Sequence, residues 1–296
     1  DVGRARRVLR LTRVFADVAK DDARIGDARD ERESTRFEVL PLADLDPTRA
    51  QRQWSVGATG FGLSRFRGLS LRWLNTGRTL PGQTVDQIGG EPVRARGFRL
   101  CEACGKLDSS TGTSSAREHR AWCEHRSDPR EHVIQIDLMR DLVTEALALI
   151  LPQEFASDPI GAASLASALM LGLEIATGGA PDHLGVISVP YPVPHGSPGE
   201  TRLALLLHDL VPGGTGYLTD FEDPAVIWAL LTRAAQRLET CPCAAEGKDM
   251  CHRCLQPYPM RGAPEEVSRA SALHALRLIL GLEADEPAAD LDPATP

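Results

Sequence analysis

The chain has 296 residues, of which 42% are hydrophobic and 25% charged, and its net charge is −8. This length and composition suit a globular protein with one large domain or two modest ones. The negative net charge argues against a protein that coats nucleic acid by bulk electrostatics, and the 5% aromatic content argues against a broad base-stacking platform.

The N-terminal half begins with charged sequence. Residues 1–36 carry an apolar spacing at Val8, Leu11 and Phe15, which predicts a helix followed by a charged linker. Residues 37–132 mix short apolar stretches with glycine and proline, which predicts a small β-rich region that ends in a Cys/His-rich segment.

Residues 49–99 are locally basic. They contain only two acids, Asp86 and Glu91, against nine arginines: 49, 52, 65, 67, 72, 78, 94, 96 and 99. Two interpretations stay open, a surface that contacts phosphate and an ordinary solvated face of a small sheet. We favour the solvated face, since a run of charged residues usually forms a solvent-exposed surface.

The first cysteine cluster has the spacing Cys101-x2-Cys104-x14-His119-x3-Cys123. The sequence CEACG resembles one half of a zinc ribbon, in which Gly105 permits the turn after the second cysteine. His119 would complete a Cys3His set, and His125 is the competing fourth ligand. We favour His119 and expect a zinc knuckle.

Residues 133–282 read as a compact domain. Val133–Asp137 alternates like a strand, with 145–151 as its partner strand, although a helix over 138–150 is the alternative. Asp158-Pro159 and Asp223-Pro224 are typical helix starts. We therefore expect helices from 159 to about 176, from 224, and from near Pro264 to Gly281, with strands over 184–193 and 202–208. The acidic tail, 283–296, is predicted to be disordered.

A hydrophobic strand runs into a glycine-rich turn at His208-Asp-Leu-Val-Pro-Gly-Gly-Thr-Gly-Tyr217. Such a turn can offer backbone N–H groups to an anion, or its glycines can simply supply positive φ in a tight connection. We favour the tight connection. His208 and Asp209 are expected to be a buried structural pair rather than catalytic residues.

The second cluster is Cys241-x-Cys243-x7-Cys251-x2-Cys254. Two close cysteine pairs joined by a short polar loop can place four thiolates around one zinc ion. Two disulfides or an iron–sulfur centre are the alternatives, and zinc is favoured because nothing indicates export. Four thiolates leave no position for water, so the site is expected to be structural. A zinc hydrolase is the weaker hypothesis.

Catalytic signals are missing. Gly105-Lys106 and Gly247-Lys248 are not followed by the Ser or Thr of a phosphate-binding loop, and no catalytic residue is predicted. The longest apolar run, 160–176, is too short to span a membrane and contains Glu174. We therefore expect a cytoplasmic protein with no membrane partner.

The strand ending in HDLVPGGTGY, the following helix and the C-x-C-x7-C-x2-C spacing resemble the MrfA-type zinc-binding domain, found at the C-terminus of certain DEAD/DEAH-box helicases and also in the DrmB component of the DISARM system. The resemblance covers about 133–280, and FRLCEACGKLD with EHRAWC resembles the segment that precedes the domain in large bacterial members. It implies that Cys241, Cys243, Cys251 and Cys254 form the family's zinc site.

The expected architecture is α+β, with a mostly antiparallel central sheet covered by helices and two zinc knuckles. The resemblance implies a non-catalytic accessory region of a superfamily 2 helicase that engages DNA or a partner subunit in DNA repair or phage defence. The helicase motor would lie in the same chain or in a separate partner subunit, and its ATP hydrolysis would belong to the parent protein. The alternative is a DrmB-like scaffold that acts with a separate helicase.

Overall fold

The computed structural model describes eleven stretches of the chain, and these divide between two compact units. Unit 1 comprises Asp1–Leu42 and Arg72–Asp141, and unit 2 comprises Ala43–Leu71 and Leu142–Pro296. Long strands contribute residues to both units, and the segments 37–132 and 133–282 expected above stay a prediction. The described stretches are 7–10, 37–57, 59–78, 86–88, 91–106, 119–126, 133–179, 181–193, 199–251, 253–255 and 267–281.

The described residues form an eight-stranded, mostly antiparallel sheet and a separate pair, β5 with β6. The main order is β2-β4-β8-β10-β9, with β3 paired to β4 and β1 and β7 paired to β8. Antiparallel pairing joins β10 to both β8 and β9, whereas β1 runs parallel to β8. The strands are β1 Val8–Arg10, β2 Phe37–Ala43, β3 Arg52–Ser55, β4 Gly62–Arg78, β5 Asp86–Ile88, β6 Glu91–Val93, β7 Phe98–Cys101, β8 Val133–Ile150, β9 Leu184–Pro192 and β10 Thr201–Asp209.

The single strand β8 replaces the two shorter elements expected over the same residues. Both the partner strand at 145–151 and the alternative helix over 138–150 are wrong. The end of β8 is rich in leucine and alanine, which favour helix in isolation. Its register against β10, with Ala148 opposite Leu206, gives the backbone a complete set of partners in the sheet. Pairing with a distant strand therefore overrides the local preference.

The start of the chain also departs from expectation. The prediction of a helix within 1–36 is wrong for Val8–Arg10, because these residues form the strand β1. Leu9 aligns with Leu138 of β8, and Arg10 lies 2.9 Å from Asp141. The remainder of 1–36, like the tail 283–296, lies outside the described residues, apart from Arg7.

The helices of unit 2 begin and end where local signals place them. Helix α1, Pro159–Thr177, is capped by the Asp158 side chain, which accepts from the N–H of Gly161, and ends at Gly178 with φ 75°. Helix α2, Pro224–Thr240, is capped by Asp223 in the same way. These two helices and the strands β9 and β10 confirm the sequence expectations.

The last helix, α3, spans Arg269–Leu280 and ends at Gly281 as expected. Its predicted start near Pro264 is wrong. Ser268 has an extended backbone, and its side chain accepts from the N–H of Ser271, so the helix begins at Arg269. The N-cap serine satisfies a backbone donor that the first turn leaves without an intrahelical partner.

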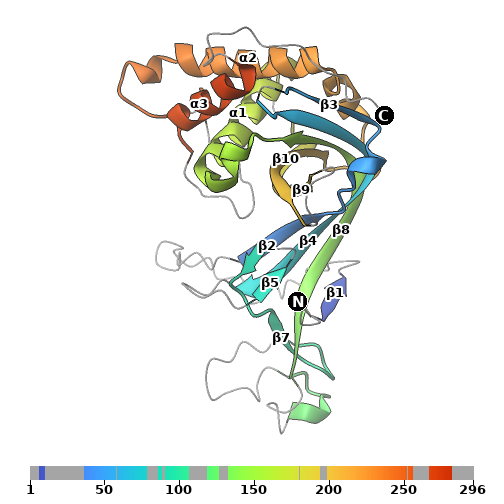
Figure 1. Ribbon diagram of the computed structural model, residues 1–296. Helices are drawn as coiled ribbons and strands as arrows, with labels where there is room; N and C mark the ends of the chain where they lie inside the picture. Colours follow the sequence, from blue (N-terminus) through green and yellow to red (C-terminus); the bar gives the residue numbers. More distant parts are fainter. Residues whose placement is uncertain are drawn as a thin grey trace. The chain divides into compact units, whose positions relative to one another are not determined.

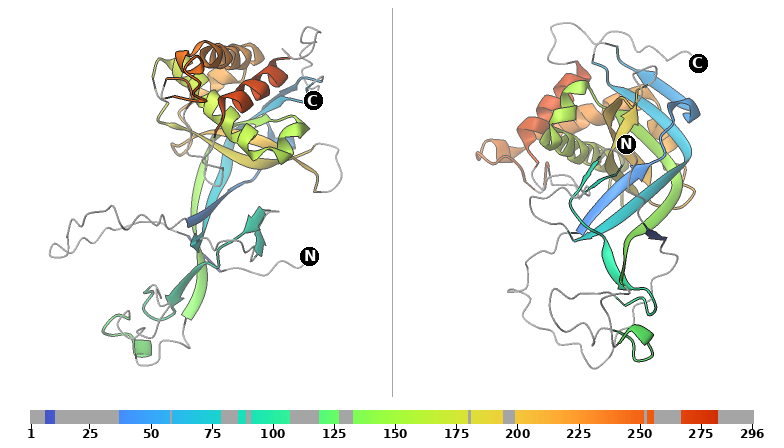
Figure 2. Two further views of the ribbon diagram at one scale, coloured as in Figure 1. Left: turned by 90° about the vertical axis from the view of Figure 1, so that its left-hand side faces the viewer. Right: turned by 60° about the horizontal axis from the view of Figure 1, so that its bottom comes forward.

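The three helices group together beside β9 and β10 in unit 2 (Figures 1 and 2). Their apolar faces share one core with alternate residues of the strands, such as Leu147, Leu205 and Val186. Contrary to the expectation that this run is too short, the α1 stretch Ile160–Thr177 is long and apolar enough to cross a membrane by length and composition, but 61% of it is buried inside the protein. It is thus packed as a core helix.

Candidate metal centres

The four cysteines near the C-terminus, the four-cysteine cluster, are positioned by the end of α2 and two tight turns. Cys241 is the residue that ends α2, and Cys243 lies in the 3-10 turn Pro242–Ala244 that follows. The N–H of Cys254 donates to the carbonyl of Cys251 at 3.1 Å, which closes the second turn. Short turns of this kind bring both sulfurs of a pair to the same side.

The sulfurs of this cluster lie within 4.8 Å of one another. The Sγ atoms of Cys241 and Cys251 are 3.6 Å apart, as are those of Cys243 and Cys254. Four thiolates about 2.3 Å from a tetrahedral zinc would be separated by about 3.8 Å, whereas a disulfide would need about 2.05 Å. The two-disulfide alternative is therefore wrong, and the donor set fits a single zinc ion.

Two arginines from the helices hold the cluster in place. Arg269 Nη1, at the start of α3, lies 3.3 Å from Cys243 Sγ, and Arg269 Nη2 donates to the carbonyl of Lys248 at 2.9 Å. Arg237 of α2 donates to the carbonyl of Arg253 at 2.9 Å. A guanidinium beside a thiolate offsets the negative charge that four sulfurs bring to one divalent ion.

Backbone donors favour the ionised form of one thiol in each cluster. The N–H of Arg253 donates to Cys251 Sγ at 3.4 Å and lowers the pKa of Cys251 to about 7. Burial opposes ionisation of Cys104, but backbone hydrogen bonds from Arg120 and Lys106 lower its pKa to about 6. Metal ligation requires thiolates, and burial raises the pKa of Cys123 to about 11 and that of Cys243 to about 12, so in the absence of metal the turns favour ionisation of only one thiol in each cluster.

The upstream Cys3His cluster consists of Cys101, Cys104, His119 and Cys123, whose donor atoms also lie within 4.8 Å of one another. Cys101 and Cys123 are separated by 3.6 Å at Sγ. His119 Nδ1 lies 3.3 Å from Cys123 Sγ and 3.7 Å from Cys104 Sγ. Cys101 is the last residue of β7, and the N–H of Gly105 donates to its carbonyl at 2.9 Å, forming the turn that the CEACG sequence predicted.

The structure separates the two histidines that competed for the fourth position. His119 faces the three sulfurs, whereas His125 lies in a 3-10 turn with its Nε2 3.6 Å from Glu124. His119 is therefore the residue placed to complete the set. Spacing alone could not decide this, because both histidines lie within a few residues of Cys123.

Substitution of the histidines gives a direct test. We expect His119→Ala to lower the zinc content of the purified chain from about two to about one ion per molecule, because a three-ligand site binds zinc much more weakly. His125→Ala is the matched control and should keep both ions. Elemental analysis of the two variants, after exchange into metal-free buffer, measures the difference. The reverse pattern would assign the ligand to His125.

The two clusters differ in their surroundings. Cys241, Cys243 and Cys254 belong to the main core of unit 2, in contact with residues of the helices and with Leu255. In the described part of the chain, Ala103 is the one apolar side chain packed against the buried cysteines of the Cys3His cluster. Among the described residues the upstream knuckle thus has almost no apolar core of its own, which is the situation in which a metal replaces one.

The glycine-rich turn is built as a structural connection. Gly213, Gly214 and Gly216 all have positive φ, near 80°. A Cβ at Gly214 would lie 2.5 Å from Glu145 Cγ, so glycine is required there by space as well as by conformation. The N–H groups of Gly213 and Gly214 donate to the carbonyls of Val143 and Val211. These N–H donors are already hydrogen-bonded within the chain. This favours the interpretation of the turn as a tight connection and argues against an anion-binding site.

Asp209 fastens the same turn. It is fully buried, and its carboxylate accepts from the N–H of Val211 at 2.8 Å, from the N–H of Thr215 at 2.6 Å and from the Thr215 hydroxyl. Burial would raise the pKa of Asp209, but these hydrogen bonds, with the charge of His183, lower it. His208 is buried beside it at 2% exposure. The expected structural pair is confirmed as buried.

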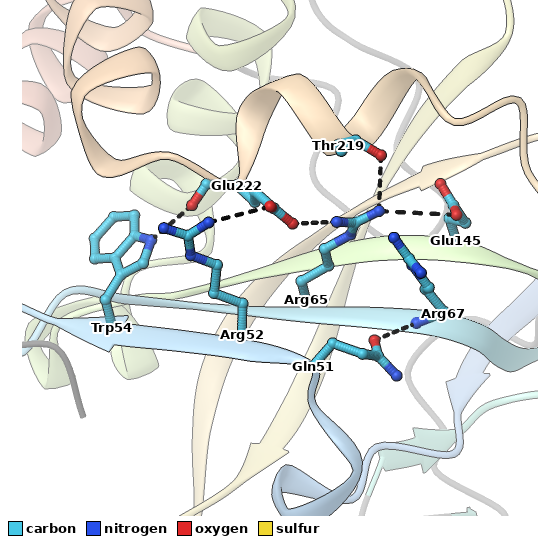
Figure 3. A network of polar contacts seen from close by, with 8 residues as sticks. All are labelled: Gln51, Arg52, Trp54, Arg65, Arg67, Glu145, Thr219 and Glu222. Carbon is cyan, nitrogen blue, oxygen red and sulfur yellow. Dashed lines mark hydrogen bonds and ion pairs between the residues drawn. The ribbon is translucent and has the colours of Figure 1, made fainter. Parts of the chain in front are cut away.

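A polar network ties the segment after this turn to β3 and β4 (Figure 3). The Arg65 side chain, only 4% exposed, pairs with Glu222, donates to Thr219 Oγ1 at 2.7 Å and lies 3.9 Å from Glu145. Arg52 pairs with the other Glu222 oxygen at 3.2 Å. Two arginines and two glutamates balance in charge, so the network is a structural clamp.

Sequence reasoning missed Arg65, Glu222 and Arg269 as structural residues. The sequence places Arg65 among nine arginines on a solvated face, whereas the structure buries it; Arg52 and Arg67 are exposed as expected. Glu222 and Arg269 carry no spacing signal, because their partners are far away in the chain. For Arg65, the apolar neighbours Leu63 and Phe66 were the available hint of burial.

Comparison with known proteins adds a family to this geometry. The family model of the MrfA Zn-binding domain matches residues 165–255, less than a third of the chain, and this segment contains both the glycine-rich turn and the four-cysteine cluster. The match lies inside the segment 133–282 expected to form that domain. No curated protein matches the chain.

One solved structure, described as "Crystal Structure of DUF1998 helicase MrfA bound to DNA", aligns with 14% identity and a TM-score of 0.41. The alignment covers 82% of this chain and 25% of that one, so the chain spans about a quarter of the helicase's length. Neither comparison bears on the DrmB-like scaffold, which stays a prediction.

Proposed function

We propose, from the premise that residues 165–255 form an MrfA Zn-binding domain, that the chain is a non-catalytic zinc-binding region of a superfamily 2 DEAD/DEAH-box helicase. In this proposal it helps the motor engage nucleic acid or a partner subunit, in DNA repair or phage defence. The ligands are Cys241, Cys243, Cys251 and Cys254 in one site and Cys101, Cys104, His119 and Cys123 in the other.

The observation that carries the proposal is the position of the four-cysteine cluster. Its sulfurs lie at separations suited to one zinc ion, and all four residues fall inside the segment matched by a zinc-binding domain model. The domain takes its name from MrfA, a helicase whose crystal structure was solved bound to DNA. A motor in the same chain or in a separate subunit would supply ATP hydrolysis, since this sequence has no phosphate-binding loop.

The zinc ions would be structural. When bound, zinc supplies a rigid link between turns and needs all four ligands of a closed tetrahedral site, which leaves no position for a reacting water. The residues themselves position neighbouring segments: Arg269 and Arg237 attach the four-cysteine cluster to α3 and α2. All seven cysteines are free, which fits a reducing compartment, and we place the protein in the cytoplasm.

Binding of nucleic acid as a function of salt tests the proposal. We expect the zinc-loaded chain to bind single- and double-stranded DNA, with log K falling linearly against log salt at a slope of roughly −2 to −3, because a chain of negative net charge offers only a few local phosphate contacts. Fluorescence anisotropy between low and moderate salt measures this slope. A chain that binds no DNA, or binds with no dependence on salt, would contradict a role in engaging nucleic acid.

A further inference from the structure

The tryptophan of the Cys3His knuckle is unusually exposed. Trp122 leaves 66% of its surface to solvent, more than any other large apolar side chain in the described part of the molecule. The other three tryptophans are packed: Trp54 and Trp228 lie 5.7 Å apart at their ring centroids, and Trp73 lies under the guanidinium of Arg140. An indole presented in this way offers one of the largest apolar contact surfaces that a side chain can bring to a ligand.

The exposed ring is carried on a tightly closed turn. Trp122 lies between His119 and Cys123, both members of the Cys3His cluster. The N–H of Cys123 donates to the carbonyl of Arg120 at 2.9 Å, and Cys123 itself is only 5% exposed. The backbone on both sides of Trp122 is thus anchored to the cluster. An aromatic side chain on a fixed turn loses little conformational entropy when it binds.

Basic residues lie in the same two turns as the ring. Backbone hydrogen bonds from Arg120 and Lys106 reach the same sulfur, that of Cys104, so the two turns of the knuckle lie against each other. Basic side chains outnumber acidic ones among the exposed charged residues of the described knuckle: Lys106, Arg120, Arg126, Glu102 and Glu124. Arginine guanidinium groups pair with phosphate and also stack on bases.

We propose that Trp122 stacks on an unpaired base of single-stranded nucleic acid, with Arg120 and Lys106 close to the neighbouring phosphates. The inference rests on the proposed engagement of nucleic acid and specifies its form. In a duplex both faces of every base are covered by the stack, so only an unpaired base offers its face to an indole. Such stacking tolerates any sequence, because every base has a π-face.

The test compares variants of the full chain, loaded with zinc, on a labelled oligothymidine strand. We expect Trp122→Ala to weaken binding by about tenfold, the loss of one stacked base, while Trp122→Phe keeps most of the affinity. Val143→Ala is the matched control, since Val143 is also exposed, at 52%, but lies in unit 2. Zinc content measured for each variant shows whether the knuckle is intact.

Two further readouts identify the contact as stacking on a base. The wild-type chain should bind a strand with abasic sites weakly. This affinity should be close to the affinity of the Trp122→Ala variant for oligothymidine. Base contact should also quench tryptophan fluorescence in the wild-type chain, and Trp122→Phe should remove that quenching while it still binds. If Trp122→Ala weakens binding to the abasic strand as much as it weakens binding to oligothymidine, Trp122 contacts the backbone and not a base. That result would overturn the inference.

The outcomes separate this inference from the proposed function. A wild-type chain that binds no nucleic acid would refute both. A wild-type chain that binds, together with a zinc-loaded Trp122→Ala variant that binds equally well, would refute the stacking role alone and assign the exposed ring to another partner, such as a protein surface.

Discussion

Replacing Cys254 by serine is expected to remove one of the two zinc ions and to lower the free energy of unfolding by about 4–5 kcal/mol. For a chain of this size the melting temperature should fall by roughly 10–15 °C. The effect is large because Cys254 is 3% exposed and shares its core with the three helices, so loss of the metal loosens the packing against α2 and α3. Elemental analysis and thermal melting by circular dichroism measure the two effects together.

The same substitution in the other cluster is the matched control. Cys101→Ser should also remove one zinc ion, but it should affect melting less, because among the described residues Ala103 is the only apolar side chain packed against that cluster. A Cys254→Ser variant that keeps two zinc ions and melts like the wild type would contradict the ligand assignment. A well-folded wild-type chain that contains no metal would contradict the role of zinc in folding.

Replacing Arg65 by methionine is expected to lower the free energy of unfolding by about 2–3 kcal/mol, because it leaves Glu222 and Glu145 without the charge that balances them. The loss should be smaller than for a fully buried pair, since the Glu222 side chain is 19% exposed and keeps Arg52 as a partner. Urea unfolding followed by circular dichroism measures it. Arg67→Met, at an exposed position two residues along the same strand, is the control and should stay within about 0.5 kcal/mol of the wild type.

The pH dependence gives an independent check on the same network. Burial would raise the pKa of Glu222, but the hydrogen bond and charge of Arg65, with those of Arg52, hold it below its ordinary value. The stabilisation is therefore present above the unfolded pKa of about 4.3 and is lost as the pH falls through the lower folded pKa. The difference between Arg65→Met and the wild type should shrink over that range. A difference that does not change with pH would show that packing, and not charge, accounts for the loss.

A double substitution separates the pair from its surroundings. If Arg65 acts through Glu222, Arg65→Met combined with Glu222→Gln should be less destabilising than the sum of the two single changes. Simple additivity would mean that each residue acts through other contacts, such as that between Arg65 and Thr219.

The elements that the sequence determined are those specified by neighbouring residues. Asp158-Pro159 and Asp223-Pro224 start α1 and α2 because an acidic cap and a proline are sufficient locally, and Gly178 ends α1 because glycine adopts positive φ without cost. Likewise, the close ligand pairs such as Cys101 with Cys104 and Cys251 with Cys254 could be predicted from their spacing, because two residues in one tight turn lie close together in any fold.

Only the tertiary structure decided the features that depend on distant partners. Residues 133–150 form one strand because β10 and β7 pair with it, and Val8–Arg10 form a strand because β8 does. Arg65 is buried because Glu222, far along the chain, provides the opposite charge. His119, and not His125, lies beside the three sulfurs of the upstream cluster, and Trp122 faces solvent, because of how two turns meet. Local sequence encodes secondary-structure propensity, but burial and strand pairing depend on which distant segments pack against a residue in the folded chain.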